Sequence, residues 1–342
     1  MPDTLALCFE EHVKRFSDFG QPSLDICEGS IRYLINEFWT AGQRQAHALH
    51  EVSYRACFKP QLPEFFIRRL TKPGDAVYDP FMGRGTTPVQ AALMGRRPVG
   101  NDVNPLSVLL CRPRLNPPVL REVAHRLGQI TWDAGAPDDP DLLAFYSPQT
   151  LRHIAALRRW LMKRAPLTGN PDPVDDWIRM VAINRLTGHS PGFFSVYTLP
   201  PNQAVSAESQ RKINAKRGQT PPDRDVKTLI LKKTAALLAD GPIPPHPPAL
   251  LTTGAAQSTP AIGDGTINTF ILLIYHATGT DIDVPDFAVA HLPARKPYRG
   301  TRRIDEAMGM TLPPAIPVRR TCLGNGVILG IFAISPAIED QE

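Results

Sequence analysis

The run from Asp79 to Thr87, Asp-Pro-Phe-Met-Gly-Arg-Gly-Thr-Thr, constrains the fold of this chain more than any other stretch. The apolar residues before it, Ala76–Tyr78, are typical of a buried strand. Residues 88–94 after it predict a helix, because proline suits a first helical turn and Gly95 suits the left-handed position just past a helix end. Residues 98–101 then predict a second strand. The order strand, glycine-rich turn, helix, strand is a βαβ unit and predicts an α/β fold with a parallel sheet.

Asp102 follows the second predicted strand, about 20 residues beyond the glycines, where a βαβ unit presents a carboxylate to a ribose. Gly83 and Gly85 have no Cβ, so their backbone can bend sharply and lie against a ligand. A phosphate-binding P-loop is excluded, because it requires a Lys before Ser or Thr and residues 85–87 contain none. The alternative interpretation is an ordinary tight turn with a surface Asp at a strand end.

This unit resembles the cofactor motif of S-adenosylmethionine-dependent DNA amino-methyltransferases, which modify adenine N6 or cytosine N4. The family motif reads Asp-Pro-Phe-x-Gly-x-Gly-Thr, then a helix, Gly-Arg and a strand ending Gly-x-Asp-x-Asn-Pro. Residues 79–86, 95–96 and 100–105 fill these positions. The resemblance implies S-adenosyl-L-methionine as cofactor, with its methionine part near Asp79 and Phe81. The cofactor-binding residues that it implies are Lys59, Asp79, Phe81, Gly83, Gly85, Thr86, Asp102 and Asn104.

A second matching segment begins at Phe58-Lys59-Pro60 and runs to Leu70. Its likeness to the family's other cofactor-side motif implies a loop and helix start that contact the methionine carboxylate. Lys59 supplies a positive charge there, and a helix N-terminus adds its partial positive charge. An amphipathic helix that only packs on the sheet is the alternative.

The resemblance implies a Rossmann-like class I methyltransferase sheet with helices on both faces and a helical insertion. We expect a helical N-terminal segment at 1–50 and the cofactor-binding half of the methyltransferase domain at 51–120. Residues 121–240 would form a helical, basic insertion that is a candidate for target recognition, with helices over residues 121–130, 148–164 and 175–186 and a strand at 193–197. Residues 241–342 would hold the remainder of the sheet and begin with a proline-rich loop.

The chain of 342 residues has a net charge of +5, and its basic residues are concentrated between residues 208 and 233. Such a patch can contact the phosphates of double-stranded DNA, although a solvated helix is the ordinary interpretation of a charge run. Five scattered cysteines without zinc spacing predict neither a metal site nor a disulfide framework, which favours a cytoplasmic location. No apolar run is long enough to predict a membrane span. The predicted DNA-binding residues are Arg211, Lys212, Lys216 and Arg217.

The family's catalytic motif, a strand ending in Asp, Asn or Ser followed by Pro-Pro and an aromatic residue, is not found. Its polar atoms accept hydrogen bonds from the target amino group, and the aromatic ring stacks on a base that has left the duplex. Residues 199–202, Leu-Pro-Pro-Asn, follow a predicted strand but fail at both defining positions. They are still the nearest candidates for a divergent catalytic loop, with Pro200, Pro201 and Asn202 as its residues.

The motif is due after the apolar strand predicted from residue 269, but the chain continues through Tyr275 and His276 without prolines. Helix and strand periodicities fade after about Asp281. One hypothesis is a shift of the reading frame near residues 268–275, which translation of the coding DNA in the other two frames tests. The other is genuine divergence, with Tyr275 and His276 in place of the loop.

Two functions remain open. The first is a site-specific DNA methyltransferase, with a cognate restriction endonuclease as a possible partner. The second is a catalytically inactive relative that binds cofactor or nucleic acid. Methylation of RNA or protein is a weaker alternative, because a fold alone does not fix a substrate.

Overall fold

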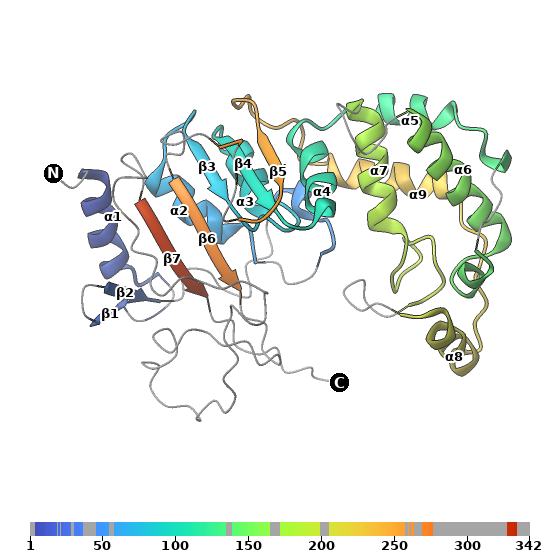
Figure 1. The fold of residues 1–342 in the computed structure, drawn as a ribbon, viewed down its shortest axis with the longest axis horizontal. Coiled ribbons are helices and arrows are strands. Elements are labelled where there is room, and N and C mark those ends of the chain that lie inside the picture. The colour runs from blue at the N-terminus through green and yellow to red at the C-terminus, as the bar shows by residue number, and fades with distance from the viewer. Residues whose placement is uncertain are drawn as a thin grey trace.

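The computed structural model shows a parallel sheet with helices beside it (Figure 1). Among the described residues, no helix has the length and hydropathy that a bilayer crossing requires. The described residues are 4–18, 20, 22–28, 31–36, 46–54, 58–134, 139–164, 172–198, 205–256, 259, 261–262, 269–275 and 327–333.

The sheet has five strands in the order β5-β4-β3-β6-β7, and every neighbouring pair is parallel. The chain order reverses at β3, because β4 and β5 lie on one side of it and β6 and β7 on the other. The carboxyl end of β3 is therefore at the point where open parallel sheets bind ligands. The strands are β3 (Ala76–Asp79), β4 (Arg97–Asp102), β5 (Leu250–Thr253), β6 (Thr269–Tyr275) and β7 (Val327–Ala333).

Three helices pack on this sheet: α2 (Gln61–Leu70), α3 (Thr86–Leu93) and α4 (Pro105–Leu115). α3 contacts both α2 and α4, so all three lie on one face. In the part of the chain described, no helix covers the other face, where the sequence predicted helices as well. Residues 276–326, which connect β6 to β7, lie outside the described residues. The α/β class is confirmed, while the two-faced arrangement is not.

The βαβ unit forms where the sequence predicts it. Thr86 opens α3 one residue after Gly85, and Gly95 takes a positive φ of 74° just past the helix end. Asn104 caps α4 by accepting a hydrogen bond from the Leu106 N–H at 3.0 Å, and Pro105 is the first helical residue. Each terminus thus uses the residue type that its backbone geometry favours.

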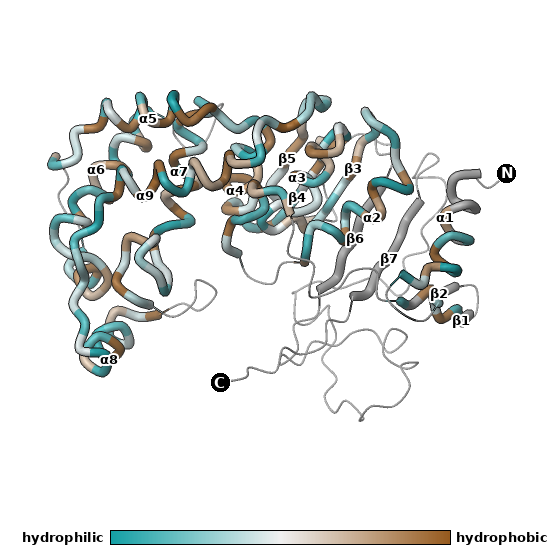
Figure 2. Tube along the Cα trace, turned by 180° about the vertical axis from the view of Figure 1, so that it is seen from behind, coloured by the Kyte–Doolittle hydropathy of each residue, from teal (hydrophilic) through white to brown (hydrophobic). Residues whose placement is uncertain are grey.

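A helical region adjoins α4 and carries the two longest of the described helices, α6 and α7 (Figures 1 and 2). Apolar and polar residues alternate along these helices, and their apolar sides form one core with the residues around α4. Trp177 is fully buried in this core and donates to the Thr234 hydroxyl at 3.1 Å. The helices are α5 (Leu120–Gly128), α6 (Pro148–Arg164), α7 (Pro173–Arg185), α8 (Ala207–Arg217) and α9 (Val226–Leu237).

The prediction of a helical segment over residues 1–50 is wrong in part. Among the described residues of this segment, only α1 (Thr4–Arg15) and a 3-10 turn at Ala48–His50 are helical. β1 (Leu24–Glu28) and β2 (Ile31–Ile35) form an antiparallel hairpin in which Glu28 pairs with Ile31. The β-branched residues on both sides of Gly29-Ser30 are the hairpin signal that the sequence interpretation overlooked.

The predicted strand at 193–197 is also wrong. These residues form a coil in which only Tyr197 bridges Gly188. Phe194 donates its N–H to the Arg185 carbonyl at 2.8 Å, and Val196 donates to the Phe145 carbonyl at 2.9 Å. The backbone is therefore hydrogen-bonded to two different parts of the helical region, and burial of the aromatic side chains outweighs their strand propensity.

Candidate functional site

Two carboxylates end adjacent strands at the reversal point of the sheet. Asp79 is the last residue of β3 and pairs in register with Gly100, while Asp102 is the last residue of β4. The glycine-rich loop that follows β3 lies between them. The pairing brings together the motif residues that the sequence predicted, although they are more than twenty positions apart along the chain.

The glycine loop is held against Asp102. Gly83 has a φ of 50° and donates its N–H to Asp102 Oδ2 at 2.8 Å. Gly85 has a φ of 84°, and a Cβ added to it would lie 2.7 Å from the Cβ of Cys111 in α4. Left-handed backbone and close packing both require glycine at residue 85. The loop therefore approaches α4 more closely than a chain with a side chain at residue 85 could.

A buried arginine supports this loop from behind. Arg114 of α4 is fully buried, and its guanidinium donates to the carbonyls of Leu110 at 2.8 Å, Leu49 at 3.0 Å and Arg84. Carbonyl partners replace the water that the cation loses on burial. The arginine thus ties the loop to α4 and to the 3-10 turn before it.

Asp102 is half-buried and accepts two backbone hydrogen bonds. Oδ2 takes the Gly83 N–H and Oδ1 takes the Asn104 N–H, both at 2.8 Å. An ionised carboxylate has about four acceptor positions, so two bonds leave it able to accept further donors. Its backbone partners fix its orientation before any ligand arrives.

Asp79 is the buried member of the pair, with a relative exposure of 3%. Its Oδ1 accepts the Phe81 N–H at 3.0 Å. Burial raises the pKa of the Asp79 carboxyl to about 6, although the Thr87 hydroxyl and the Phe81 N–H lower it, and the charge of Asp102 raises it further. Asp79 therefore favours a cationic partner, which would stabilise its charged form.

The remaining predicted cofactor residues differ in their surroundings. Phe81 is 39% exposed beside the glycine loop. Thr86 is buried, and its hydroxyl accepts a hydrogen bond from Arg84 Nε at 3.2 Å. Lys59 is exposed ahead of α2, where its carbonyl accepts the Leu62 N–H at 3.1 Å. Asn104 caps α4.

Sequence interpretation missed two residues that lie against these carboxylates. Val103 is 77% exposed directly after Asp102, which leaves an apolar side chain at the strand end. Tyr54 contacts the glycine loop and hydrogen-bonds to Asn104 at 3.3 Å. Nothing in the sequence around Tyr54 marks it, because the contact joins positions 50 residues apart.

Asn101, one residue before Asp102, is another position that was missed. Its buried side-chain amide donates to the carbonyls of Gly254 at 2.9 Å and Pro80 at 3.3 Å, and it accepts from the Thr252 hydroxyl at 2.8 Å. These bonds join the loops that follow β3 and β5. The side chain therefore positions three strand ends relative to one another.

The predicted catalytic residues Pro200, Pro201 and Asn202 lie outside the described residues. β6 was predicted as the strand before the catalytic loop, and it pairs with β3 in parallel, with Tyr78 opposite Phe270. Its last residue, Tyr275, is therefore at the same edge of the sheet as Asp79. His276 and the residues up to 326 lie outside the described part.

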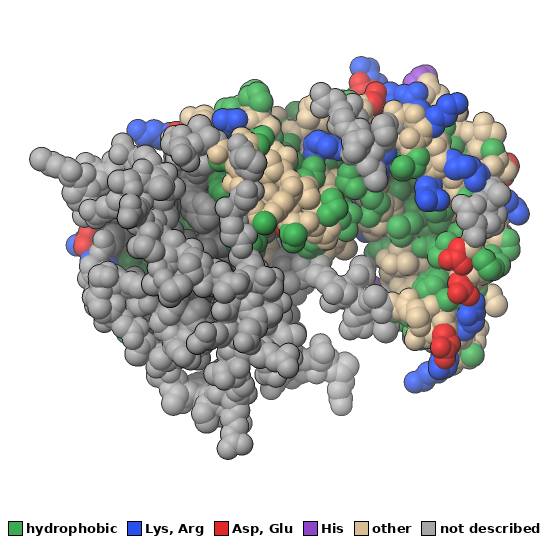
Figure 3. Space-filling model, in the orientation of Figure 1, with side chains coloured by type: hydrophobic (Ala, Val, Ile, Leu, Met, Phe, Trp, Pro, Cys, Tyr) green, Lys and Arg blue, Asp and Glu red, His purple; other side chains and the backbone are tan. Residues whose placement is uncertain are grey.

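The predicted DNA-binding residues lie on α8, in the helical region and away from the strand ends (Figure 1). Arg211 pairs with Asp141, Lys212 pairs with Glu208 at 2.7 Å, and Arg217 lies 3.8 Å above the ring centroid of Tyr197. Intramolecular partners thus take up much of the charge of this helix. Figure 3 shows further Lys and Arg side chains over the helical region. The sequence of α6 contains Arg152, Arg158, Arg159, Lys163 and Arg164.

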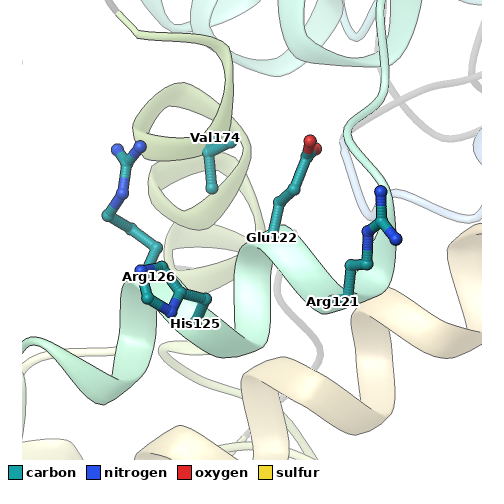
Figure 4. A pocket seen from close by; sticks show the side chains of 5 residues that line it. All are labelled: Arg121, Glu122, His125, Arg126 and Val174. Atoms are coloured by element: carbon teal, nitrogen blue, oxygen red, sulfur yellow. The ribbon is translucent and has the colours of Figure 1, made fainter.

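A separate surface pocket lies between α5 and the start of α7 (Figure 4). Arg126 joins Asp172 of the α7 cap at 3.0 Å, and Glu122 accepts the Val119 N–H at 3.2 Å. Its charged groups are therefore used in ion pairing and helix capping rather than aimed at a common point. The lining residues are Arg121, Glu122, His125, Arg126 and Val174.

Comparison with known proteins agrees with the chemistry of the strand ends. A family model described as DNA methylase matches residues 28–108, which include the glycine loop, Asp102 and Tyr54. The resemblance to DNA amino-methyltransferases is thereby confirmed for this segment.

Two curated relatives match within short segments. The type II methyltransferase M.MjaII of Methanocaldococcus jannaschii is 40% identical over 72 residues, which cover 21% of this chain and 13% of the relative. The type II methyltransferase M2.DpnII of Streptococcus pneumoniae is 42% identical over 59 residues, covering 16% of this chain and 22% of the relative. The similarity therefore spans less than a quarter of either relative.

Proposed function

We propose that this protein is a DNA methyltransferase that transfers a methyl group from S-adenosyl-L-methionine to adenine N6 or cytosine N4. One observation carries the proposal. The glycine loop donates the Gly83 N–H to Asp102 across the ends of two parallel strands, within the segment that matches DNA methylases. The carboxylate, the close backbone and the reversal of strand order are the features that nucleoside cofactors use in α/β sheets.

The residues at the strand ends suit this cofactor. Asp102 retains acceptor positions for the two ribose hydroxyls, while the exposed Val103 offers apolar contact to the adenine ring and Phe81 to the methionine part. Asp79 favours a cation, which fits the ammonium group of the methionine part. Lys59 and the start of α2 would attract its carboxylate. When bound, the cofactor supplies the electrophilic methyl group.

The sheet would then be a Rossmann-like class I methyltransferase sheet. Its reversal at β3 and the cofactor residues on β3 and β4 support this assignment. The end of β6, next to β3, is where the target amino group would meet the methyl group. Helices on the second face belong to the same proposal.

Double-stranded DNA is the proposed substrate. The basic side chains of α6 and α8 offer phosphate contacts, whose contribution falls as salt rises. The target base would leave the duplex to reach the strand ends. The type II relatives suggest a restriction-modification role with a cognate endonuclease, which would place the protein in the cytoplasm with its DNA.

The second candidate is a relative that binds cofactor without transferring methyl groups. The observation that favours it is the lack of a Pro-Pro-aromatic sequence after β6. Without that sequence, the amino group loses the carbonyl and side-chain acceptors that orient its lone pair.

The decisive experiment measures transfer of labelled methyl groups from S-adenosyl-L-methionine to duplex DNA of mixed sequence. The wild-type protein is compared with Asp102→Ala and with Asp133→Ala, a matched change at an exposed carboxylate far from the strand ends. We expect incorporation by the wild type and by Asp133→Ala, and its loss in Asp102→Ala. Cofactor binding is measured in parallel by calorimetry.

Each result has one meaning. Cofactor binding without incorporation on any DNA would favour the inactive relative. Failure of the folded wild type to bind S-adenosyl-L-methionine would overturn both candidates. Equal loss of activity in Asp133→Ala would remove the assignment of Asp102 to the site.

A further inference from the structure

Tyr54 lies against the glycine loop and the start of α4. Its Cε1 is 3.4 Å from the position that a Cβ on Gly83 would occupy, so the ring fills the side of the loop that glycine leaves open. Its hydroxyl accepts a hydrogen bond from Asn104 Nδ2 at 3.3 Å. Gly83 and Asn104 are the two residues whose N–H groups hold Asp102. One tyrosine therefore contacts both residues that hold the carboxylate.

The chain on the N-terminal side of this tyrosine is fixed from two directions. Arg84, between the two loop glycines, donates to the Val52 carbonyl at 2.8 Å. Asn184, near the end of α7, donates to the Ser53 carbonyl at 3.1 Å. Backbone held in this way keeps the ring in one place, and a preorganised group loses less conformational entropy when a ligand binds.

We propose that Tyr54 is a further binding residue of the site, which packs its ring and hydroxyl against the nucleoside half of the cofactor. This inference rests on the proposed cofactor. A ribose that donates its hydroxyls to Asp102 lies beside Gly83 and Asn104, and Tyr54 is the aromatic side chain in contact with both. An aromatic ring gives large contact area at low entropic cost, and its phenolic oxygen adds a polar contact.

The test is calorimetric titration of the full chain with S-adenosyl-L-methionine, adenosine and free methionine. Tyr54→Ala should weaken the binding of S-adenosyl-L-methionine and of adenosine by the same factor, about tenfold or more. Tyr54→Phe retains the ring and should weaken both by only about threefold. Methionine binding should not change. Tyr146→Phe is the matched control, because the hydroxyl of this buried tyrosine donates to the Leu186 carbonyl in the helical region.

The outcomes separate this inference from the proposed function. If the wild type binds the cofactor and Tyr54→Ala binds it equally well, Tyr54 is no binding residue. If Tyr54→Ala lowers the binding stoichiometry or the thermal midpoint while the folded fraction keeps the wild-type Kd, the role is structural and the inference fails. If Tyr54→Ala weakens the binding of methionine and leaves that of adenosine unchanged, the inference also fails. Absence of wild-type cofactor binding overturns the proposed function itself.

Discussion

At the scale of single residues, Asp79 combines burial with charge. A carboxyl with 3% exposure and a pKa raised to about 6 is mostly ionised at neutral pH, without an ion pair among the described residues. Such a group lowers the stability of the free protein. Binding sites often contain such destabilising charges, because binding of a ligand with the opposite charge offsets the loss of stability.

The raised pKa of Asp79 predicts how the contribution of this residue to stability changes with pH. In the unfolded chain, Asp79 releases its proton near pH 3.8, whereas in the folded protein it keeps the proton to about pH 6. The folded state therefore binds more protons between these values, and the contribution of Asp79 to stability falls as pH rises through this window. Asp79→Asn, which cannot ionise, should gain on the order of 3 kcal/mol relative to the wild type between pH 4 and pH 7.5.

Urea unfolding of both proteins at the two pH values measures this gain. Other titrating groups are common to both proteins and cancel in the difference. A constant difference in unfolding free energy across the range would show that Asp79 does not titrate as described. The same variant should bind S-adenosyl-L-methionine more weakly, since the ammonium group loses its carboxylate.

At this scale, the sequence predicted correctly those residues whose type is determined by their own backbone conformation or by their place at a strand end. The glycines at 83, 85 and 95 and the Asp that ends β4 were all predicted and lie where expected. Tyr54 and Asn101 were not, because their importance comes from partners 50 and 153 positions away. Such partners become visible only once the strands are aligned.

At the scale of elements, the glycine loop is shaped by its packing against α4. Gly85 and Gly74 have nearly the same backbone, with φ of 84° and 92°. They differ in surroundings, because a Cβ at residue 85 would meet Cys111 whereas one at residue 74 would meet no atom within 4 Å. Alanine substitutions at these two glycines therefore separate the cost of left-handed backbone from the cost of steric overlap.

Gly74→Ala should cost about 1 kcal/mol of unfolding free energy, from left-handed backbone alone. Gly85→Ala should cost about 2–4 kcal/mol, since overpacking against α4 adds to the same strain. Chemical denaturation measures both, and calorimetry shows whether Gly85→Ala also loses the cofactor. Equal costs at the two positions would mean that α4 moves aside without penalty.

Helices and strands with a strong period were predicted well. α6 was expected over residues 148–164 and forms there, and α5 and α7 lie within about two residues of their predicted bounds, the usual uncertainty of helix ends. The aromatic residues at 193–197 led to an incorrect strand prediction, because strand propensity reflects packing context more than backbone preference. Its buried side chains pack inside the helical region instead.

At the scale of the whole molecule, two neighbouring aspartates at the start of α7 join the sheet region to the helical region. Asp175 binds Arg126 of α5 and, at 3.1 Å, Arg164 of α6. Asp176 binds Arg112 of α4 through two hydrogen bonds of 2.7 and 3.0 Å. α4 begins three residues after Asp102, so this ion pair connects the strand-end site to the helices.

No sequence pattern predicted this network, because it depends on which helices become neighbours. The sequence indicated helices and a basic composition, and it assigned the basic residues between 208 and 233 to DNA contact or solvent. Burial of both aspartate side chains, 0% and 4% exposed, shows that several arginines balance internal charge instead. Net charge therefore overstates the positive surface left for a nucleic acid.

The ion pair between Arg112 of α4 and Asp176 of α7 can be tested by substitution. Arg112→Leu leaves Asp176 buried without its two donors, and removal of one partner from a buried pair costs about 3–5 kcal/mol. The double variant Arg112→Leu with Asp176→Leu should recover part of that loss. The buried carboxylate is gone, but the buried Arg179, 3.8 Å from Asp176, loses this ion-pair partner. Arg68→Ala breaks the exposed pair with Glu64 within α2 and should cost less than about 0.5 kcal/mol.

Urea denaturation of the four proteins distinguishes the two kinds of pair. If the Arg112 variant is destabilised and the double variant is more stable than it, the ion pair acts mainly by satisfying a buried charge. Equal, small costs for Arg112→Leu and Arg68→Ala would mean that water reaches Asp176. In the first case, the position of α4, and with it the cap at Asn104 beside Asp102, depends on a contact with α7. Changes in the helical region would then alter cofactor affinity without touching the cofactor.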